Sequence, residues 1–165
     1  SDGPAGYSLT TDGSATFSFT NIREGSIYYT NGNFGTAGDS RSSKHIFRGL
    51  TSNDFLNEIF IGDVANSRLD FQDNSMNTVE IFVTATRLVT LGGASFKFEA
   101  CFQNTAGTLS MLGFAKTRLG YTDDAYDVVL DVDEDSTDTM RLRCKGVTGH
   151  SIRWMAVVNT VEVTQ

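Results

Sequence analysis

Apolar and polar side chains alternate along three segments of this chain, and this alternation constrains the fold more than any other feature. A repeat of two residues puts every apolar side chain of a strand on one face of a sheet, whereas a helix repeats every 3.6 residues. The alternation therefore predicts half-buried β-strands, with Trp154 as an anchor of the core. The apolar positions are Val79, Ile81, Val83 and Ala85; Phe96, Phe98, Ala100 and Phe102; and Ile152, Trp154, Ala156 and Val158.

Turn-forming residues divide the chain into short segments. Asp12-Gly13 separates two alternating stretches and predicts an N-terminal hairpin. Asn104–Gly107 predicts another turn, and Leu109–Phe114, which is apolar, predicts a central strand after it. Tyr126–Val132 and Met140–Lys145 flank an acidic turn, which indicates a second hairpin.

Three further short strands are expected at His45–Leu50, Glu58–Ile61 and Arg68–Phe71. Asn53–Asn57 could form one helical turn, capped by Ser52. With eight to ten strands and no helix of three turns, the chain is expected to be all-β. The most economical architecture is a β-sandwich of jelly-roll type.

The domain organisation depends on a segment rich in Gly, Ser and Asn, Asn33–Ser43. Such a composition is typical of a connector. We therefore expect an N-terminal strand or hairpin arm with its connector over residues 1–40 and a β-sandwich over residues 41–165. One continuous domain is the alternative. Because the chain begins with Ser1 rather than Met and has no signal peptide, we expect a processed chain or part of a longer one.

The balance of charge limits the classes of partner. The 13 Lys and Arg against 20 Asp and Glu give a formal net charge of −7. This charge argues against a general binder of nucleic acid or of anionic membranes, since both need a basic surface. The longest apolar run, Trp154–Val158, is far shorter than the roughly 20 residues of a membrane-spanning helix, so no membrane insertion is expected.

Eight of the 20 acids lie between residues 123 and 138. Asp131, Asp133 and Asp135 have the spacing of a calcium loop, which makes them candidate ligands. The sixth and twelfth positions of such a loop, however, are Ser136 and Leu142 instead of Gly and Glu. The alternatives are a solvated hairpin tip, where Arg141, Arg143 and Lys145 on the partner strand offset part of the repulsion between the acids, or paired carboxylates for glycoside hydrolysis.

No catalytic motif is present, and we expect neither an enzyme nor a cofactor. His45 and His150 have no metal-ligating or nucleophilic partner at local spacing, so each is expected to be hydrogen-bonded or solvent-exposed. Counting by twos puts Cys144 on the inner face of its strand and Cys101 on the outer face of another. The two thiols are therefore expected to be free, because a disulfide needs converging side chains.

The C-terminal segment from Gly149 to Thr164, GHSIRWMAVVNTVEVT, resembles the closing segment of a family of tailed-bacteriophage virion proteins, in which an "irW-a-v-t-ev" strand ends the chain. Three further stretches resemble the same family in the same order, so the resemblance covers roughly residues 38–164. These are Gly38-Asp39-Ser40 with Ile46–Gly49 and Thr51; Val79–Arg87 leading into Phe96–Gly107; and Tyr126–Val128 with Met140–Leu142.

The resemblance implies a location in the virion and a C-terminal, β-rich region of a tail-fibre, spike or other minor structural protein. We expect an appendage tip, most simply a homotrimer, that binds other virion proteins and a glycan or protein of the host surface. A capsid decoration protein that stabilises the phage head is the first alternative, and a non-viral carbohydrate-binding module is the second. Only residues 1–37 precede the matched region, whereas members often carry long repetitive stems.

In such heads, binding specificity usually belongs to loops. Tyr121, Asp123 and Asp124 are the side chains we would test first for ligand binding, since Tyr121 could stack on a sugar ring. The loops expected to carry binding residues are 31–43, 104–107, 117–124 and 134–139.

Overall fold

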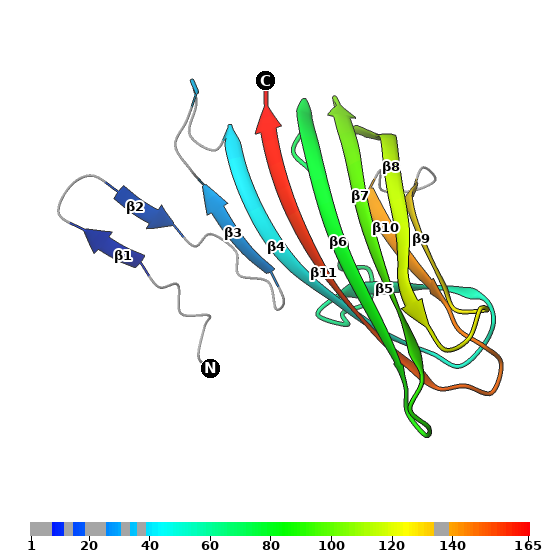
Figure 1. Ribbon diagram of the computed structural model, residues 1–165. Helices are drawn as coiled ribbons and strands as arrows, with labels where there is room; N and C mark the ends of the chain where they lie inside the picture. Colours follow the sequence, from blue (N-terminus) through cyan, green and yellow to red (C-terminus); the bar gives the residue numbers. More distant parts are fainter. Residues whose placement is uncertain (1–7, 12–14, 19–25, 31–33, 36–38, 134–138) are drawn as a thin grey trace.

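The computed structural model describes residues 8–11, 15–18, 26–30, 34–35, 39–133 and 139–165, and every regular element within them is a β-strand (Figure 1). The all-β prediction is therefore confirmed. In these ranges no helix is long and apolar enough to cross a membrane. The strands are β1 (Ser8–Thr11), β2 (Ala15–Ser18), β3 (Ser26–Thr30), β4 (Ser40–Thr51), β5 (Leu56–Ile61), β6 (Ser75–Arg87), β7 (Gly93–Thr105), β8 (Thr108–Tyr121), β9 (Asp127–Asp133), β10 (Thr139–Lys145) and β11 (Ile152–Thr164).

Nine of the strands form one antiparallel sheet in the order β8-β7-β6-β11-β4-β5-β10-β9, with β3 paired to β4. The C-terminal strand β11 lies in the middle and pairs with both β4 and β6 over nearly its whole length. β1 and β2 pair antiparallel with each other in a sheet of their own, as the Asp12-Gly13 signal predicts.

A change of partner along β4 bends this sheet. One edge of β4 pairs with β11, while the other pairs with β3 through residues 41–45 and with β5 only at Phe47 and Arg48. Beyond that short contact, β5 leaves the plane and continues into β10 and β9, which lie behind the long strands (Figure 1). The sheet thus curls into a nearly closed barrel. The predicted sandwich has two separate sheets, whereas here both layers belong to one.

The core fills the space between the two layers. Alternate residues of β6, β7 and β11 are buried, as the sequence pattern predicts, and they face apolar residues of β5, β9 and β10. Trp154 is only 2% exposed, and its indole Nε1 donates a hydrogen bond to Thr51 Oγ1 at 2.8 Å. Cys144 is buried and Cys101 is half-buried, and both thiols are free as expected.

Two local predictions between β4 and β6 are wrong. Asn53–Asn57 forms no helical turn, because Asn53 Oδ1 accepts the Phe55 N–H and β5 already begins at Leu56. Arg68–Phe71 is not a strand, since only Leu69 makes an isolated bridge, to Met140. The apolar side chains of this segment, Leu69 and Phe71, are nonetheless buried in the core.

The predicted strand at Leu109–Phe114 is present within β8, but its predicted central position is wrong, because β8 is an edge strand. The chain reverses after β7 through Ala106 and Gly107, both at positive φ, which gives a tight hairpin. β8 stands at the end of the strand order and pairs with β7 alone. Only Leu109 is buried, whereas Leu112 and Phe114 are 55% and 53% exposed.

Gly93 allows the close approach of β6 and β7 beside their hairpin. A Cβ at this position would lie 2.0 Å from the Ala85 carbonyl oxygen, so Gly93→Ala must displace backbone. We expect this variant to lower the free energy of unfolding by about 1–3 kcal/mol in urea denaturation. Gly120→Ala is the control, because its Cβ would meet no heavy atom within 4 Å. Equal losses for the two variants would contradict the packing described.

Candidate functional site

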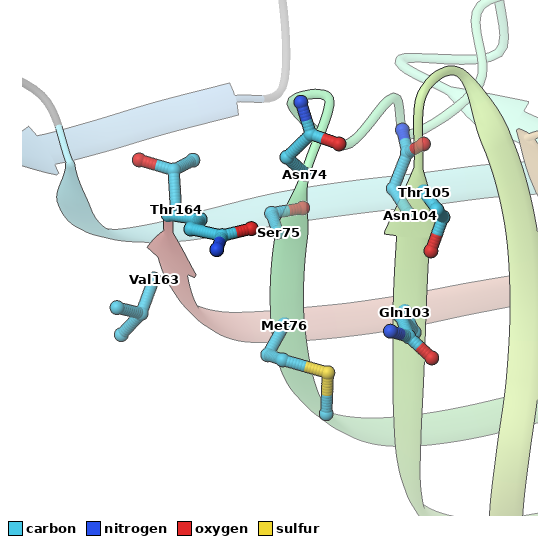
Figure 2. A pocket seen from close by; sticks show the side chains of 9 residues that line it. Asn74, Ser75, Met76, Gln103, Asn104, Thr105, Val163 and Thr164 are labelled. Carbon is cyan, nitrogen blue, oxygen red and sulfur yellow. The ribbon is translucent and has the colours of Figure 1, made fainter.

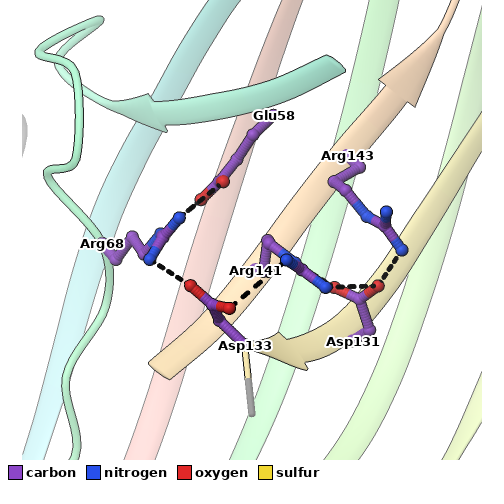
Figure 3. Close-up of polar contacts among 6 residues, drawn as sticks. All are labelled: Glu58, Arg68, Asp131, Asp133, Arg141 and Arg143. Atoms are coloured by element: carbon purple, nitrogen blue, oxygen red, sulfur yellow. Dashed lines mark hydrogen bonds and ion pairs between the residues drawn. The ribbon is translucent and has the colours of Figure 1, made fainter. Parts of the chain in front are cut away.

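Three arginines from two parts of the chain join the acidic segment and Glu58 in a continuous row of ion pairs (Figure 3). Arg68, from the loop after β5, donates to Glu58 at 2.6 Å and to Asp133 at 2.5 Å. Arg141 of β10 lies 2.9 Å from Asp131 and 3.4 Å from Asp133, and Arg143 also pairs with Asp131. Positive and negative groups therefore alternate across β5, β10 and β9.

Two of the three candidate calcium ligands, Asp131 and Asp133, take part in this row of ion pairs. The Asp131 and Asp133 carboxylates each accept from two guanidinium groups, whereas Asp135 lies outside the described residues. The hydrogen bond to Glu58 contributes most to raising the pKa of Arg68, and the hydrogen bond to Asp131 does the same for Arg141. Within the part of the chain that the structure describes, no His, Cys, Asp and Glu side chains form a metal-binding group.

We expect the thermal midpoint of unfolding to be the same in calcium chloride and in EDTA. Calcium would have to displace guanidinium groups that already satisfy Asp131 and Asp133, and a hard cation needs six to eight oxygen ligands. Thermal melts followed by circular dichroism provide the measurement. A midpoint that rises with added calcium would contradict the expectation.

Two cations of β8 bridge the gap that remains in the barrel. Lys116 Nζ lies 2.5 Å from Asp127 Oδ1 and donates to the Val128 carbonyl at 2.6 Å. Arg118 donates to the Tyr126 carbonyl at 3.1 Å and pairs with Asp124 at 3.3 Å. Burial opposes ionisation of Asp127, but the hydrogen bonds from Lys116 and from backbone outweigh it, so the pKa of Asp127 is lowered. Side chains thus join the edge strands β8 and β9.

The three candidate ligand-binding residues lie close to this gap. Tyr121 is 53% exposed but ends β8 instead of belonging to a loop, because β7 pairs with β8 as far as this residue. The Arg118 guanidinium lies 4.8 Å from the centre of its ring and so covers one of its faces. Asp123 Oδ1 accepts the Ala125 N–H in the turn before β9, and Asp124 pairs with Arg118.

Both histidines contact hydroxyl groups of the fold, His45 in the interior and His150 at a half-buried position. His45 is fully buried between two hydroxyls, with Ser26 Oγ 2.8 Å from Nδ1 and Ser43 Oγ 2.6 Å from Nε2. Burial is the main cause that lowers the pKa of His45 to about 4, and Arg41 lowers it further. His150 Nδ1 lies 3.2 Å from the Tyr126 hydroxyl. Each histidine therefore has a hydrogen-bond partner, as the sequence predicts.

A shallow groove of about 370 Å³ lies where β6, β7 and β11 meet the end of the chain (Figure 2). Amide, hydroxyl and apolar side chains line it, including Asn74, Met76, Gln103, Asn104 and Val163. Two of its amide side chains already form hydrogen bonds within the fold. Asn104 donates to the Phe71 carbonyl and accepts from the Gly107 N–H, and Asn74 accepts from the Ala106 N–H. These bonds fix the β7–β8 turn.

The edge strand β8 exposes a group of large apolar side chains. From Ser110 to its end, this strand has no buried side chain. Leu112, Phe114, Leu119 and Tyr121 are each more than half exposed. A long apolar edge strand of this kind is usually covered, because it otherwise promotes association. The sequence does not predict this surface, because residues 109–114 fit a central strand and residues 117–124 fit a loop.

No protein-family model matches the chain, and no curated protein matches it either. Two solved structures are similar to it in fold. The tailspike protein gp49 of the Acinetobacter baumannii bacteriophage Fri1, a capsular polysaccharide depolymerase, is 13% identical with a TM-score of 0.44, over 87% of this chain and 20% of that one. The tailspike protein of Acinetobacter baumannii phage AM24 is 16% identical with a TM-score of 0.37, over 75% of this chain and 26% of that one. The matched region thus spans about a fifth of the first protein and about a quarter of the second, and similarity of this degree does not transfer an activity.

Proposed function

We propose that this chain is a structural module of a bacteriophage virion and that it works by binding other copies and other proteins. The observation that carries the proposal is the apolar edge of β8, with four large side chains more than half exposed. Exposed edges and apolar patches of this kind are typical of surfaces that join subunits. The ordered resemblance over residues 38–164 supports the virion as the place where the module assembles.

Within the virion, we propose the tip of an appendage, a tail fibre, spike or head fibre, that contacts a glycan or protein of the host surface. The ranges implied by the resemblance include β4, β6, β7 and β11, which form the middle of the sheet and bury Trp154. The proposal is for binding and not for catalysis, since His45 and His150 are engaged within the fold. Three copies per assembly is the number that the resemblance implies.

A second candidate is a capsid decoration protein, and the N-terminal hairpin favours it. In the described part of the chain, β1 and β2 pair only with each other, apart from the nine-stranded sheet. An isolated two-stranded hairpin is marginally stable in water and gains stability by packing on another surface. A neighbouring capsid subunit could supply that surface.

Immunogold labelling of intact virions tests the proposal and separates the two candidates. We expect label on the tail or on a head fibre for an appendage tip, and label spread over the head for a decoration protein. Binding of the purified chain to host cells or to purified capsids provides the matching measurement. Virions without label, together with no binding to either surface, would contradict both candidates.

A further inference from the structure

The outer face of the two middle strands carries apolar side chains at positions that are usually polar. An antiparallel sheet with one face on the core commonly presents polar residues to water on the other face. Here the outward positions near the end of β11 and the start of β6 are mostly apolar, and most of these side chains are exposed. They are Val157, Val161 and Val163 of β11 and Met76 and Phe82 of β6. Such a group is typical of a surface that another protein covers.

These side chains form one continuous surface, because β4, β11, β6 and β7 pair with one another without a shift of register. Val157 is paired with Phe82, and Val163 is paired with Met76. Figure 2 shows Val163, Met76 and Gln103 on three neighbouring strands, at the groove of about 370 Å³ that they help to line. The apolar surface thus follows the line between β11 and β6 and reaches the groove.

The charges on the two sides of this line are opposite. Beside the apolar residues, the β4–β11 side carries Lys44, whereas the β6–β7 side carries Glu80, Glu99 and Lys97. Lys97 lies 3.1 Å from Glu80 and 2.9 Å from Glu99, so one negative charge remains on that side. Lys44 and Glu99 share a row across the sheet but are three strands apart, about 14 Å, which is too far to pair within one chain. The positive side of one copy therefore complements the negative side of another.

The shape of this face suits two neighbours better than one. Because the sheet curls into a nearly closed barrel, its outer face is convex, and a single partner would touch only the middle strands (Figure 1). Copies arranged around an axis parallel to β11 would instead place the β4–β11 half of each copy on the β6–β7 half of the next. A contact between two unlike surfaces closes into a ring when the rotation is completed. Three is the smallest ring in which each copy has two different neighbours.

We propose that this outer face packs against neighbouring copies of the chain, in a ring of three whose axis runs along the line between β11 and β6. Residues of one row across the sheet then meet their counterparts in the next copy. These pairs are Val157 with Phe82, Val163 with Met76, Ser42 with Cys101 and Lys44 with Glu99 of the next copy. The contact stops before Arg48 and Arg153, because the facing positions of the next copy carry no acid. This inference rests on the proposed self-association and names its surface.

A lysine at position 163 tests the contact. Val163 is exposed in the single chain, so Val163→Lys should leave the circular dichroism spectrum unchanged. In the ring, the variant places three ammonium groups near the axis. We expect sedimentation equilibrium to give the mass of three copies for the parent, and at least a tenfold rise in the concentration of half-dissociation for the variant. Val89→Lys is the control, because this exposed residue follows the far end of β6. A parent that is a monomer or a pair, an unweakened Val163→Lys, or equal weakening by the control would overturn the proposal.

Reversal of the charged pair tests the pairing between copies. Lys44→Glu puts a carboxylate opposite Glu99 of the next copy, so we expect this variant to associate several-fold more weakly than the parent. The double variant Lys44→Glu, Glu99→Lys should recover most of the loss. Because the two positions are too far apart to pair within one chain, recovery requires contact between copies. A double variant that associates no better than Lys44→Glu would contradict the pairing.

Cross-linking tests the alignment of the copies. Ser42→Cys should react with the free Cys101 of a neighbour through a short bis-maleimide, since packed sheets lie about 10 Å apart. Leu50→Cys on the same strand is the control, because it lies eight residues, or about 26 Å, further along. Denaturing electrophoresis should show covalent species of up to three copies for Ser42→Cys alone. Equal cross-linking of both variants, or of neither, would overturn the alignment. Neither result bears on the location that immunogold labelling shows, so this inference and the virion proposal can fail separately.

Discussion

Replacing Trp154 with alanine is expected to lower the free energy of unfolding by about 3–5 kcal/mol. Trp154 is 2% exposed in β11, which has β4 on one side and β6 on the other. Its ring meets that of Tyr126 edge to face, with centres 6.4 Å apart, and its indole N–H donates to Thr51. The truncation therefore removes packing between the layers and also leaves the Thr51 hydroxyl without its donor.

Urea denaturation followed by circular dichroism measures this loss. The matched control is Met155→Ala, since Met155 is the next residue of β11 but lies on the outer face and is 48% exposed. We expect this control to change the free energy of unfolding by no more than about 0.5 kcal/mol. Trp154→Phe should fall between the two, because it keeps most of the ring packing but loses the hydrogen bond. Equal losses at 154 and 155 would contradict the described core.

The strands of the core could be predicted because burial imposes a local pattern. A strand with one face in the core must alternate, and β6, β7 and β11 do so over their buried positions. The β9–β10 hairpin was also predicted, since its two strands are close in sequence. The order of the strands in the sheet, in contrast, cannot be predicted from local patterns. That β11 lies between β4 and β6 depends on pairing between residues far apart in sequence, from Ile152 with Arg87 to Val163 with Ser40, which no local pattern specifies.

Because the order of the strands in the sheet is not specified locally, the position of β8 is predicted wrongly. An apolar stretch such as Leu109–Phe114 fits a central strand, and nothing within it distinguishes a covered edge from a central position. The two β-bulges of this strand, at Leu112 and Leu119, appear only once the register with β7 is known.

The partners of the acidic segment could also be predicted only in part. Its spacing suggested calcium for Asp131, Asp133 and Asp135, and its basic neighbours at 141–145 suggested partial neutralisation. The second suggestion agrees with the ion pairs of Arg141 and Arg143. Arg68 was not anticipated, because it reaches Asp133 from a loop 65 residues earlier. Partners of a charged cluster can come from anywhere in the chain, so a local cluster indicates charge but does not identify what binds it.

Acidification from pH 7 is expected to destabilise the protein through His45. Its pKa is about 4 in the folded state, mainly because of burial, against an ordinary value of 6.5. Between these two values the unfolded chain binds the proton and the folded chain does not. The free energy of unfolding therefore falls as the pH falls from 6.5 towards 4, by up to about 3 kcal/mol from this residue. Urea denaturation at a series of pH values measures the slope.

Glu162 must be separated from this effect, because it acts in the opposite direction. Burial is the main cause that raises its pKa, although Arg41 pairs with it at 2.6 Å, so the folded state takes up a proton there more readily than the unfolded chain. Lowering the pH through that raised value adds stability. His45→Gln should therefore remove a loss on acidification, whereas Glu162→Gln should make the loss steeper. An identical pH dependence for the parent and His45→Gln would contradict the assignment, since glutamine keeps hydrogen-bonding groups near Ser26 and Ser43 but cannot titrate.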